Sequence, residues 1–350
     1  MASVVNYVVD FYTDIMENKS DPRVKDWPLM SSPAPTMLIC LTYAFIVKVV
    51  GPKFMEKRKP FQLRKTLIVY NLIQVILSAW LFSESIAAGW FTTYSFRCQP
   101  VDYSNSPKAL RTAAGCWWYF FSKFTEFFDT FFFVLRKKND QVSKLHVIHH
   151  GVMPLSTWFG VKFSPGGHST FFGMLNTFVH IVMYSYYLLA ALGPHMQKYL
   201  WWKKYLTALQ MVQFVLVMLH AFQLLFIDCN YPKAFVWWIG LHAVMFYFLF
   251  ADFYKQAYKK RDEKIKAQLK KNEDAAIQNG RTNGYANGHA NGAANGAANG
   301  TANGTANGRV FSSNEAYQQP DKKMESSYTT QETLRNRAFI NKEKASTSAS

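Results

Sequence analysis

Seven apolar stretches, separated by short polar stretches, occupy most of the first 254 residues. A helix needs about 20 mostly apolar residues to cross the hydrocarbon core of a bilayer. The pattern therefore predicts an all-α integral membrane protein with seven transmembrane helices. These helices are expected near residues 34–50, 66–90, 115–135, 145–163, 168–192, 205–227 and 234–254. The fourth stretch is the weakest, because it carries three histidines and Pro154.

Composition divides the chain into three regions. Residues 1–33 form an N-terminal segment that opens acidic, unlike the basic start of a cleaved signal peptide. Residues 34–254 form the seven-span domain. Residues 255–350 begin with basic residues and then repeat Asn-Gly, which predicts a low-complexity, disordered tail.

The mean hydropathy of −0.09 and the net charge of +17 hide this division. Residues 1–254 hold 23 basic and 13 acidic residues, and residues 255–350 hold 16 and 9. An ordinary soluble domain is about a quarter charged, so the apolar region falls outside that class. Neither region has a pattern that suggests nucleic-acid binding.

The basic residues also predict the orientation of the chain. They gather in alternate loops, at 51–65, 136–144 and 193–204, and again at the start of the tail. Short cytoplasmic loops are enriched in Lys and Arg. We therefore expect the N-terminus to be lumenal and the C-terminus to be cytosolic, as an odd number of spans requires.

This orientation places Cys98 and Cys229 on the lumenal side, where disulfides form. We predict a Cys98–Cys229 bond, and the alternative is two free thiols. Asn18 begins the sequon Asn-Lys-Ser on the same side and is the predicted glycosylation site.

Ionisable groups inside spans are expensive and usually face an interior cavity. The third span contains Lys123, Glu126 and Asp129, and their spacing of three places them along one stripe of a helix. This stripe is either a self-neutralising structural network or part of a site, and one network can serve both purposes.

The fourth span opens with His146, His149 and His150, which share a helix face. Three clustered imidazoles are candidate metal ligands, acid/base groups or nucleophiles.

Polar stripes continue through the next two spans, which predicts one enclosed polar pocket between the helices. Its expected lining residues are Asn176, His180, Tyr184, Tyr187, Gln210 and Gln213. Basic residues lie at the expected cytosolic rim of the pocket, and they suit a substrate with an anionic, phosphate-rich head. They are Arg136, Lys137, Lys138, Lys203 and Lys204, and the alternative is that they only set topology.

Three classes of protein compete for this pattern: an enzyme acting on acyl thioesters of coenzyme A, a diiron desaturase or hydroxylase, and a seven-span receptor or transporter. A diiron site of that kind needs several histidine boxes, whereas nine histidines here form only one HxxHH cluster. A receptor does not explain the cluster beside basic loops, and no clear internal repeat supports a transporter.

Four sequence boxes together resemble the very-long-chain fatty acid elongases over roughly residues 27–265. They are KFTEFFDT (123–130), QVSKLHVIHH (141–150), NTFVHIVMYSYY (176–187) and TALQMVQ (207–213), in the order found in that family. The tail departs from the family, because it ends in KASTSAS and not in a dilysine retrieval signal.

The resemblance implies a 3-ketoacyl-CoA synthase of the endoplasmic reticulum membrane, which condenses a long-chain acyl-CoA with malonyl-CoA. The implied fold has six helices forming a barrel around a narrow acyl tunnel, with one helix outside. The implied mechanism has no cofactor and no metal: His149 is the nucleophile that forms an acyl-imidazole, with His146, His150 and His180 beside it.

The resemblance also implies membrane lipid and the reductases and dehydratase of the elongation cycle as partners, and it leaves a homodimer open. Lys123, Glu126 and Asp129 would orient the imidazoles or hold substrate carbonyls. Chain length would be set at the lumenal end of the tunnel, where Phe226, Trp237 and Trp238 are the bulky candidates.

Overall fold

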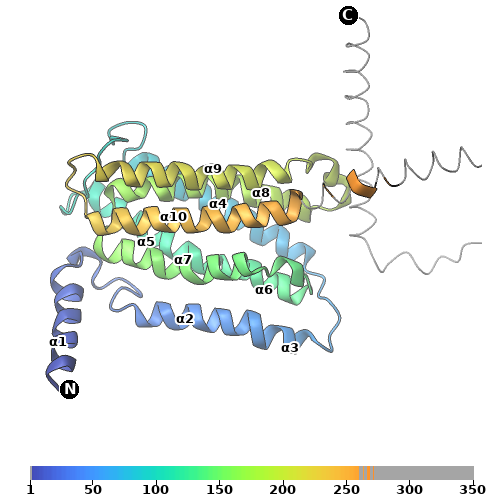
Figure 1. Ribbon diagram of the computed structural model, residues 1–350, viewed down its shortest axis with the longest axis horizontal. Coiled ribbons are helices and arrows are strands. Elements are labelled where there is room, and N and C mark those ends of the chain that lie inside the picture. The colour runs from blue at the N-terminus through green and yellow to red at the C-terminus, as the bar shows by residue number, and fades with distance from the viewer. Residues whose placement is uncertain (1, 260–262, 264–265, 269–270, 272–350) are drawn as a thin grey trace, which may run out of the picture. The chain divides into compact units, whose positions relative to one another are not determined.

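The computed structural model describes residues 2–259, 263, 266–268 and 271, all of which belong to the unit Met1–Ala276. The part of the chain described in this way contains helices and no strand (Figure 1). Its α-helices are α1 (Ala2–Thr13), α2 (Ala34–Phe45), α3 (Gly51–Met55), α4 (Arg64–Ala88), α5 (Pro107–Thr125), α6 (Phe127–Leu135), α7 (Lys144–Phe163), α8 (Thr170–Ala191), α9 (Lys203–Phe222) and α10 (Lys233–Tyr254). The Asn-Gly repeat and the C-terminal KASTSAS lie outside the described residues.

Five helical stretches among the described residues are long and apolar enough to cross a membrane. They are Ala34–Met55, Arg64–Ala88, Gly167–Ala191, Lys203–Leu225 and Lys233–Tyr258. The chain is therefore a multi-pass, all-helical membrane protein. The other two predicted spans are also helical, as α5 with α6 and as α7, but their charged residues and histidines make them less apolar.

The helices pack both on α-helices next to them in the sequence and on α-helices farther away. The contacts join α4 to α8, α8 to α9, α9 to α10, α10 to α7, α7 to α5 and α5 to α4. Helix α2 packs on α7, and Figure 1 shows α7 lying between α2 and α10.

A break at Glu126 separates α5 from α6. The amide of Glu126 bonds back to the Ser122 carbonyl, and the amide of Asp129 bonds to the Glu126 carbonyl, which leaves the Thr125 carbonyl without its usual partner in the helix. Two side chains of α4 fill this gap: Tyr70 Oη donates to the Thr125 carbonyl (3.2 Å), and Gln74 Nε2 donates to Thr125 Oγ1 (3.0 Å). The break is therefore held from the neighbouring helix.

Side chains and caps set the ends of several helices. Ser143 Oγ accepts the amide of His146 (3.2 Å) and so begins α7 immediately before the histidine cluster. At the end of α8, the Arg64 guanidinium donates to the carbonyls of Ala191 and Leu192. Gly193 follows with a φ of +110°, and a Cβ there would lie 2.7 Å from Arg64 Nη2.

The segment between α1 and α2 packs on α5 and α7. The Arg23–Asp21 ion pair is 2.7 Å long and buried, and Arg23 Nη1 also donates to the carbonyls of Asp102 and Ser104. The Trp158 indole donates to the Leu29 carbonyl (2.7 Å), which ties α7 to the segment. Residues 21–30 thus cover one end of the α5–α7 pair.

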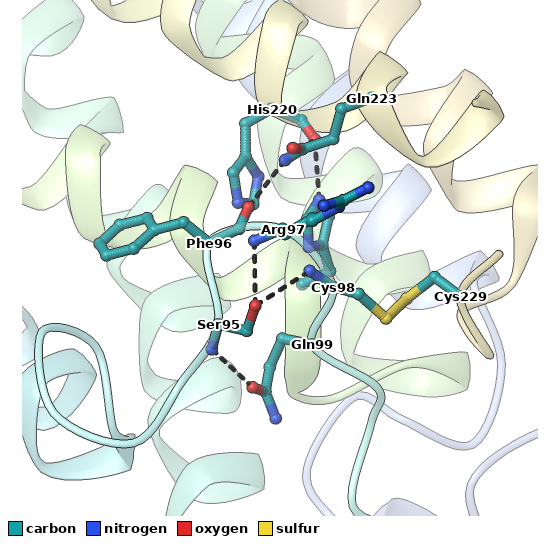
Figure 2. The surroundings of a disulfide bond; sticks show 9 residues. Ser95, Phe96, Arg97, Cys98, Gln99, His220, Gln223 and Cys229 are labelled. Atoms are coloured by element: carbon teal, nitrogen blue, oxygen red, sulfur yellow. Dashed lines mark hydrogen bonds between the residues drawn. A yellow bond between two sulfur atoms is a disulfide. The ribbon is translucent and has the colours of Figure 1, made fainter. Parts of the chain in front are cut away.

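A disulfide joins Cys98, in the loop after α4, to Cys229, in the loop before α10 (Figure 2). Ser95 Oγ accepts the amides of Arg97 and Cys98, and Gln223 Nε2 donates to the Phe96 carbonyl (2.8 Å). The disulfide and the hydrogen bond hold the two loops together at one end of the helices.

Candidate active site

A buried carboxylate, Glu126, lies at the centre of the predicted polar cluster. Its Oε1 is 2.6 Å from Lys123 Nζ and 3.3 Å from His180 Nδ1, and its Oε2 is 3.9 Å from His150 Nδ1. The Lys123 and Glu126 side chains are each 2% exposed. The helix break at Glu126 aims this carboxylate at histidines from two other helices, α7 and α8.

Asn176 extends the network on α8. Its Oδ1 accepts Lys123 Nζ (3.1 Å) and Tyr119 Oη (2.8 Å). Two donors on the oxygen fix the orientation of the amide, so Nδ2 remains the group that donates to another partner.

Asp129 and Tyr184 form a second buried pair beside this network. Tyr184 Oη donates to Asp129 Oδ2 (2.7 Å), and the Tyr70 ring meets the Tyr184 ring edge-on at 6.1 Å between centroids. The stripe predicted from the spacing of Lys123, Glu126 and Asp129 therefore faces α8, where Asn176, His180 and Tyr184 meet it.

His146 has a separate hydrogen-bonded chain. Its Nε2 lies 2.8 Å from Thr130 Oγ1, which lies 2.8 Å from Tyr43 Oη on α2. The His146 and His150 rings are 4.3 Å apart between centroids.

His149 is held by contacts with neighbouring rings. Its ring packs edge-on against Phe246 of α10 at 4.9 Å and against His150 at 5.1 Å. Within the described part of the chain it has no hydrogen-bond partner among the interactions observed, and its side chain is partly exposed. An imidazole held by packing alone keeps its ring nitrogen free to react.

A cavity of about 100 Å³ lies next to this cluster. Tyr119, which donates to Asn176, belongs to its wall, and the remaining walls come from α4, α5, α7 and α8. Gly160 and Gly173 line it, and a Cβ at either position would meet no atom within 4 Å. Mostly apolar walls beside a polar cluster suit a substrate with a reactive polar group and a hydrocarbon chain.

The structure places the remaining predicted residues less centrally. Gln210 Nε2 lies 3.5 Å from Met183 Sδ of α8, Gln213 is buried with Oε1 unpaired, and Tyr187 meets the Tyr184 ring at 6.0 Å. Lys203 and Lys204 begin α9 and are exposed.

Arg136, Lys137 and Lys138 follow α6 and are half-buried. Burial lowers the pKa of the Arg136 guanidinium, which nevertheless stays charged at neutral pH. The Lys137 amine donates to the Glu56 carbonyl (3.1 Å).

Two groups of predicted residues lie elsewhere. Phe226, Trp237 and Trp238 are 89%, 50% and 38% exposed, and none of them lines the cavity. The sequence gives a residue's depth along its helix but not which face meets a neighbour. Asn18 is exposed, as a glycosylation site requires, and its Nδ2 donates to Asp14 Oδ1 (3.0 Å).

Sequence reasoning missed four tyrosine and glutamine side chains that complete the site: Tyr43, Tyr70, Gln74 and Tyr119. Tyr119 precedes Lys123 by four residues and lies on the same helix stripe, so this spacing could have predicted it. Tyr70 and Gln74 are also four residues apart in an apolar helix. Nothing in the α2 sequence marks Tyr43.

Among the described residues, no three His, Cys, Asp or Glu side chains are arranged to hold one metal ion. The histidines instead meet a carboxylate, a hydroxyl and each other. The geometry joins a buried network of ionisable side chains to a cluster of histidines, and Tyr119 connects that network to the wall of the cavity.

Comparison with known proteins agrees with this arrangement. Residues 28–266 match the model of the GNS1/SUR4 (ELO) family. The chain is 70% identical over 272 residues to very long chain fatty acid elongase 7 of Drosophila melanogaster, covering 77% of this chain and 83% of that protein. It is 52% identical over 261 residues to elongase 7 of Rattus norvegicus (74% and 92% covered) and 49% identical over 255 residues to elongase 1 of Homo sapiens (72% and 91% covered). The chain belongs to the GNS1/SUR4 family of very long chain fatty acid elongases.

Proposed function

We propose that the protein condenses a long-chain acyl-CoA with malonyl-CoA, giving a 3-oxoacyl-CoA, carbon dioxide and free CoA. Membership of the elongase family supports the reaction class. The observation that carries the assignment to this site is the Lys123–Glu126–His180 network beside an apolar cavity. No cofactor or metal takes part in the proposed reaction.

In the first half-reaction, a ring nitrogen of His149 attacks the thioester carbonyl. The C–S bond breaks, free CoA leaves with a proton, and the acyl group stays on the imidazole. The free and partly exposed ring of His149 supports this role, since the other histidines are engaged by Glu126 or Thr130. Covalent catalysis divides one hard step into two easier ones.

In the second half-reaction, malonyl-CoA loses carbon dioxide and its enolate carbon attacks the acyl carbon, which releases His149. The enolate oxygen needs hydrogen-bond donors. Asn176 Nδ2 suits this purpose better than Tyr184, because the Tyr184 hydroxyl already donates to Asp129. Glu126 orients His180 and, after a small shortening of the 3.9 Å separation, His150.

The acyl chain would occupy the cavity lined by α4, α5, α7 and α8. The contacts described above link α4, α5, α7, α10, α9 and α8 in a closed ring, with α2 outside it, and so support a six-helix barrel. We place the opening of its tunnel on the cytosolic side, where the basic residues after α6 and at the start of α9 would receive the CoA phosphates.

The disulfide supports our proposal of seven membrane crossings. Cys98 and Cys229 must lie on the same side of the membrane, so the chain crosses an even number of times between them. Helices α8 and α9 supply two of these crossings. The number stays even only if α5 with α6, and α7, either both cross the membrane or both stay out of it. Lys123 of α5 and Asp129 of α6 are buried, whereas Trp118, Phe121 and Phe128 are exposed and would face lipid. This arrangement supports two further crossings.

The proposed location is the endoplasmic reticulum membrane, with residues 1–33 lumenal, the elongase domain at 34–254 and the tail at 255–350 cytosolic. The product would pass to the reductases and dehydratase that complete an elongation cycle.

The decisive experiment incubates the purified chain with acyl-CoA alone and measures free thiol. We expect about one CoA released per enzyme, none from His149→Ala, and turnover once malonyl-CoA is added. His242→Ala is the matched control, because His242 Nδ1 bonds the Trp238 carbonyl of its own helix (2.8 Å) and the imidazole makes no other hydrogen bond among those observed in the described residues. Condensation without prior CoA release would overturn the covalent order. No 3-oxoacyl product from a panel of acyl-CoAs would overturn the function.

A further inference from the structure

Helix α2 lies outside the ring of six helices, yet one of its side chains reaches the histidine cluster. Tyr43 is 2% exposed and its ring stacks on Phe127 at 4.1 Å. Its hydroxyl lies 2.8 Å from Thr130 Oγ1, and the same oxygen lies 2.8 Å from His146 Nε2. Three side chains from α2, α6 and α7 thus form one linear chain of hydrogen bonds.

We propose that Tyr43 and Thr130 are positioning residues that hold His146 in one tautomer and one orientation, so that α2 completes the active site from outside the barrel. The inference rests on the proposed function, because it assigns these residues to the condensation reaction. Thr130 and His146 belong to the first two sequence boxes, whereas Tyr43 lies about 80 residues before the first box and outside all four.

The available donors and acceptors decide which group donates in each of these two hydrogen bonds. Thr130 is fully buried, so its hydroxyl bonds only to its protein neighbours. Tyr43 makes no other hydrogen bond among those observed in the described chain, so its O–H donates to Thr130 Oγ1. The Thr130 hydroxyl then donates to His146 Nε2, and the His146 proton resides on Nδ1. The opposite direction would leave the buried Tyr43 O–H without an acceptor.

A fixed His146 matters because the histidines pack on one another. The His146 and His150 centroids are 4.3 Å apart, and His150 lies between His146, the Glu126 carboxylate and the His149 ring. If the His146 ring turned, His150 would lose its fixed place opposite Glu126. The hydrogen bonds from Tyr43 to Thr130 and from Thr130 to His146, here called the relay, therefore act on the reaction through His150 and His149.

Substitutions can separate this role from packing. Tyr43→Phe keeps the stacking on Phe127 and removes only the hydroxyl. Thr130→Val keeps the shape of the side chain and removes both hydrogen bonds, whereas Thr130→Ser keeps the hydroxyl. Tyr231→Phe is the matched control, because Tyr231 is another buried tyrosine, whose hydroxyl bonds Ser164 in a loop near the disulfide (3.3 Å).

The test measures the burst of CoA release from acyl-CoA, and then the kcat and KM of condensation, with purified full-length variants. We expect Thr130→Val to slow the burst by about 10-fold, and Tyr43→Phe by about 3-fold because Thr130 can still reach His146. The burst amplitude and the KM values of Tyr43→Phe should match those of the unmodified protein, and its melting temperature should match that of Tyr231→Phe, which also loses one buried hydroxyl. A packing defect would instead lower the amplitude, or lower the melting temperature below that of Tyr231→Phe.

A linear relay also predicts that the double variant is no slower than Thr130→Val alone, since Thr130→Val already disconnects Tyr43. Thr130→Ser should recover the rate to within about 2-fold, because the hydroxyl is restored. The inference is overturned if Tyr43→Phe reacts at the unmodified rate, if the two single effects multiply, or if Thr130→Ser is as slow as Thr130→Val. An unmodified protein without condensation activity would overturn the proposed function instead.

Discussion

The Nδ1 atom of His180 lies 3.3 Å from Oε1 of Glu126, and that same oxygen lies 2.6 Å from Lys123 Nζ. One carboxylate oxygen therefore links a histidine of α8 to an ammonium group of α5. Both contacts are buried, and a buried carboxylate of this kind is stable only while its partners remain.

Glu126→Gln should therefore affect both stability and activity. Lys123 would be left as an uncompensated buried charge, which destabilises proteins by about 3–5 kcal/mol. We expect a clear fall in melting temperature and at least a 100-fold loss of condensation rate, because His180 and His150 lose their orienting group. Asp14→Asn is the control, since the Asp14–Lys19 pair is exposed and its loss should leave the melting temperature nearly unchanged. Equal effects of the two substitutions would contradict the role of Glu126.

The helix break at Glu126 depends on two side chains of α4. Tyr70→Phe and Gln74→Leu should each destabilise the protein by about 1–2 kcal/mol, because each removes a donor from a partly buried backbone or hydroxyl acceptor at Thr125. Thermal unfolding in one detergent measures the effect. Ser83→Ala is the control, because Ser83 is exposed and bonds only the Trp80 carbonyl of its own helix. If all three variants unfold at the same temperature, α4 does not hold the break.

The cavity predicts the residues that limit the acyl chain. Gly160→Leu and Gly173→Leu should each fill open space in it and shift the longest accepted acyl-CoA to a shorter length, with activity on shorter substrates retained. A panel of acyl-CoAs of increasing length measures the shift. Phe226→Ala, at an exposed position, should leave the length profile unchanged. The opposite pattern would place the end of the acyl chain near α9.

Gly193→Ala should destabilise the end of α8. The φ of +110° is strained for any L-residue, and the new methyl group would lie 2.7 Å from the Arg64 side chain that caps α8. We expect a loss of about 1–2 kcal/mol in thermal unfolding. Gly151→Ala, on α7, meets no atom within 4 Å and should leave stability unchanged or slightly higher. A neutral Gly193→Ala would show that Arg64 moves without penalty.

Cys98→Ser and Cys229→Ser should lower stability equally, and the double variant should add nothing, because one bond is lost in every case. Removing a native disulfide typically costs about 2–5 kcal/mol. Thermal unfolding with and without reductant, together with non-reducing peptide mapping, measures this. Cys40→Ser tests a cysteine outside the bond, and its melting temperature should respond to reductant as that of the unmodified protein does. Two free thiols in the peptide map would show that the bond does not form.

Helical periodicity predicted much of the site because its residues repeat along single helices. Lys123, Glu126 and Asp129 share a stripe, and Asn176, His180 and Tyr184 share the stripe that faces it. The HxxHH spacing likewise placed the histidines together. Such spacings fix which residues share a face, and the cost of burying charge in a membrane makes those faces meet.

The spacing of residues within one helix could not predict which residues of different helices meet. Tyr43 reaches Thr130 only because α2 packs on α7 beside α6, and no period within α2 records that packing. The sequence around Glu126 also does not predict the helix break, since the donors that stabilise it belong to α4. Phe226, Trp237 and Trp238 were expected at the end of the tunnel, but the face that each presents depends on the rotation of its helix.

The disulfide between positions 131 residues apart also constrains how the protein is made. Translation delivers Cys98 long before Cys229, and helices α5 to α9 must emerge from the ribosome in the interval. The first thiol thus waits, unpaired or in temporary partnership, until most of the bundle has entered the bilayer. Closure of this bond therefore requires that the chain up to α9 has been made and inserted, and a pulse-chase experiment can use it to time that stage of synthesis.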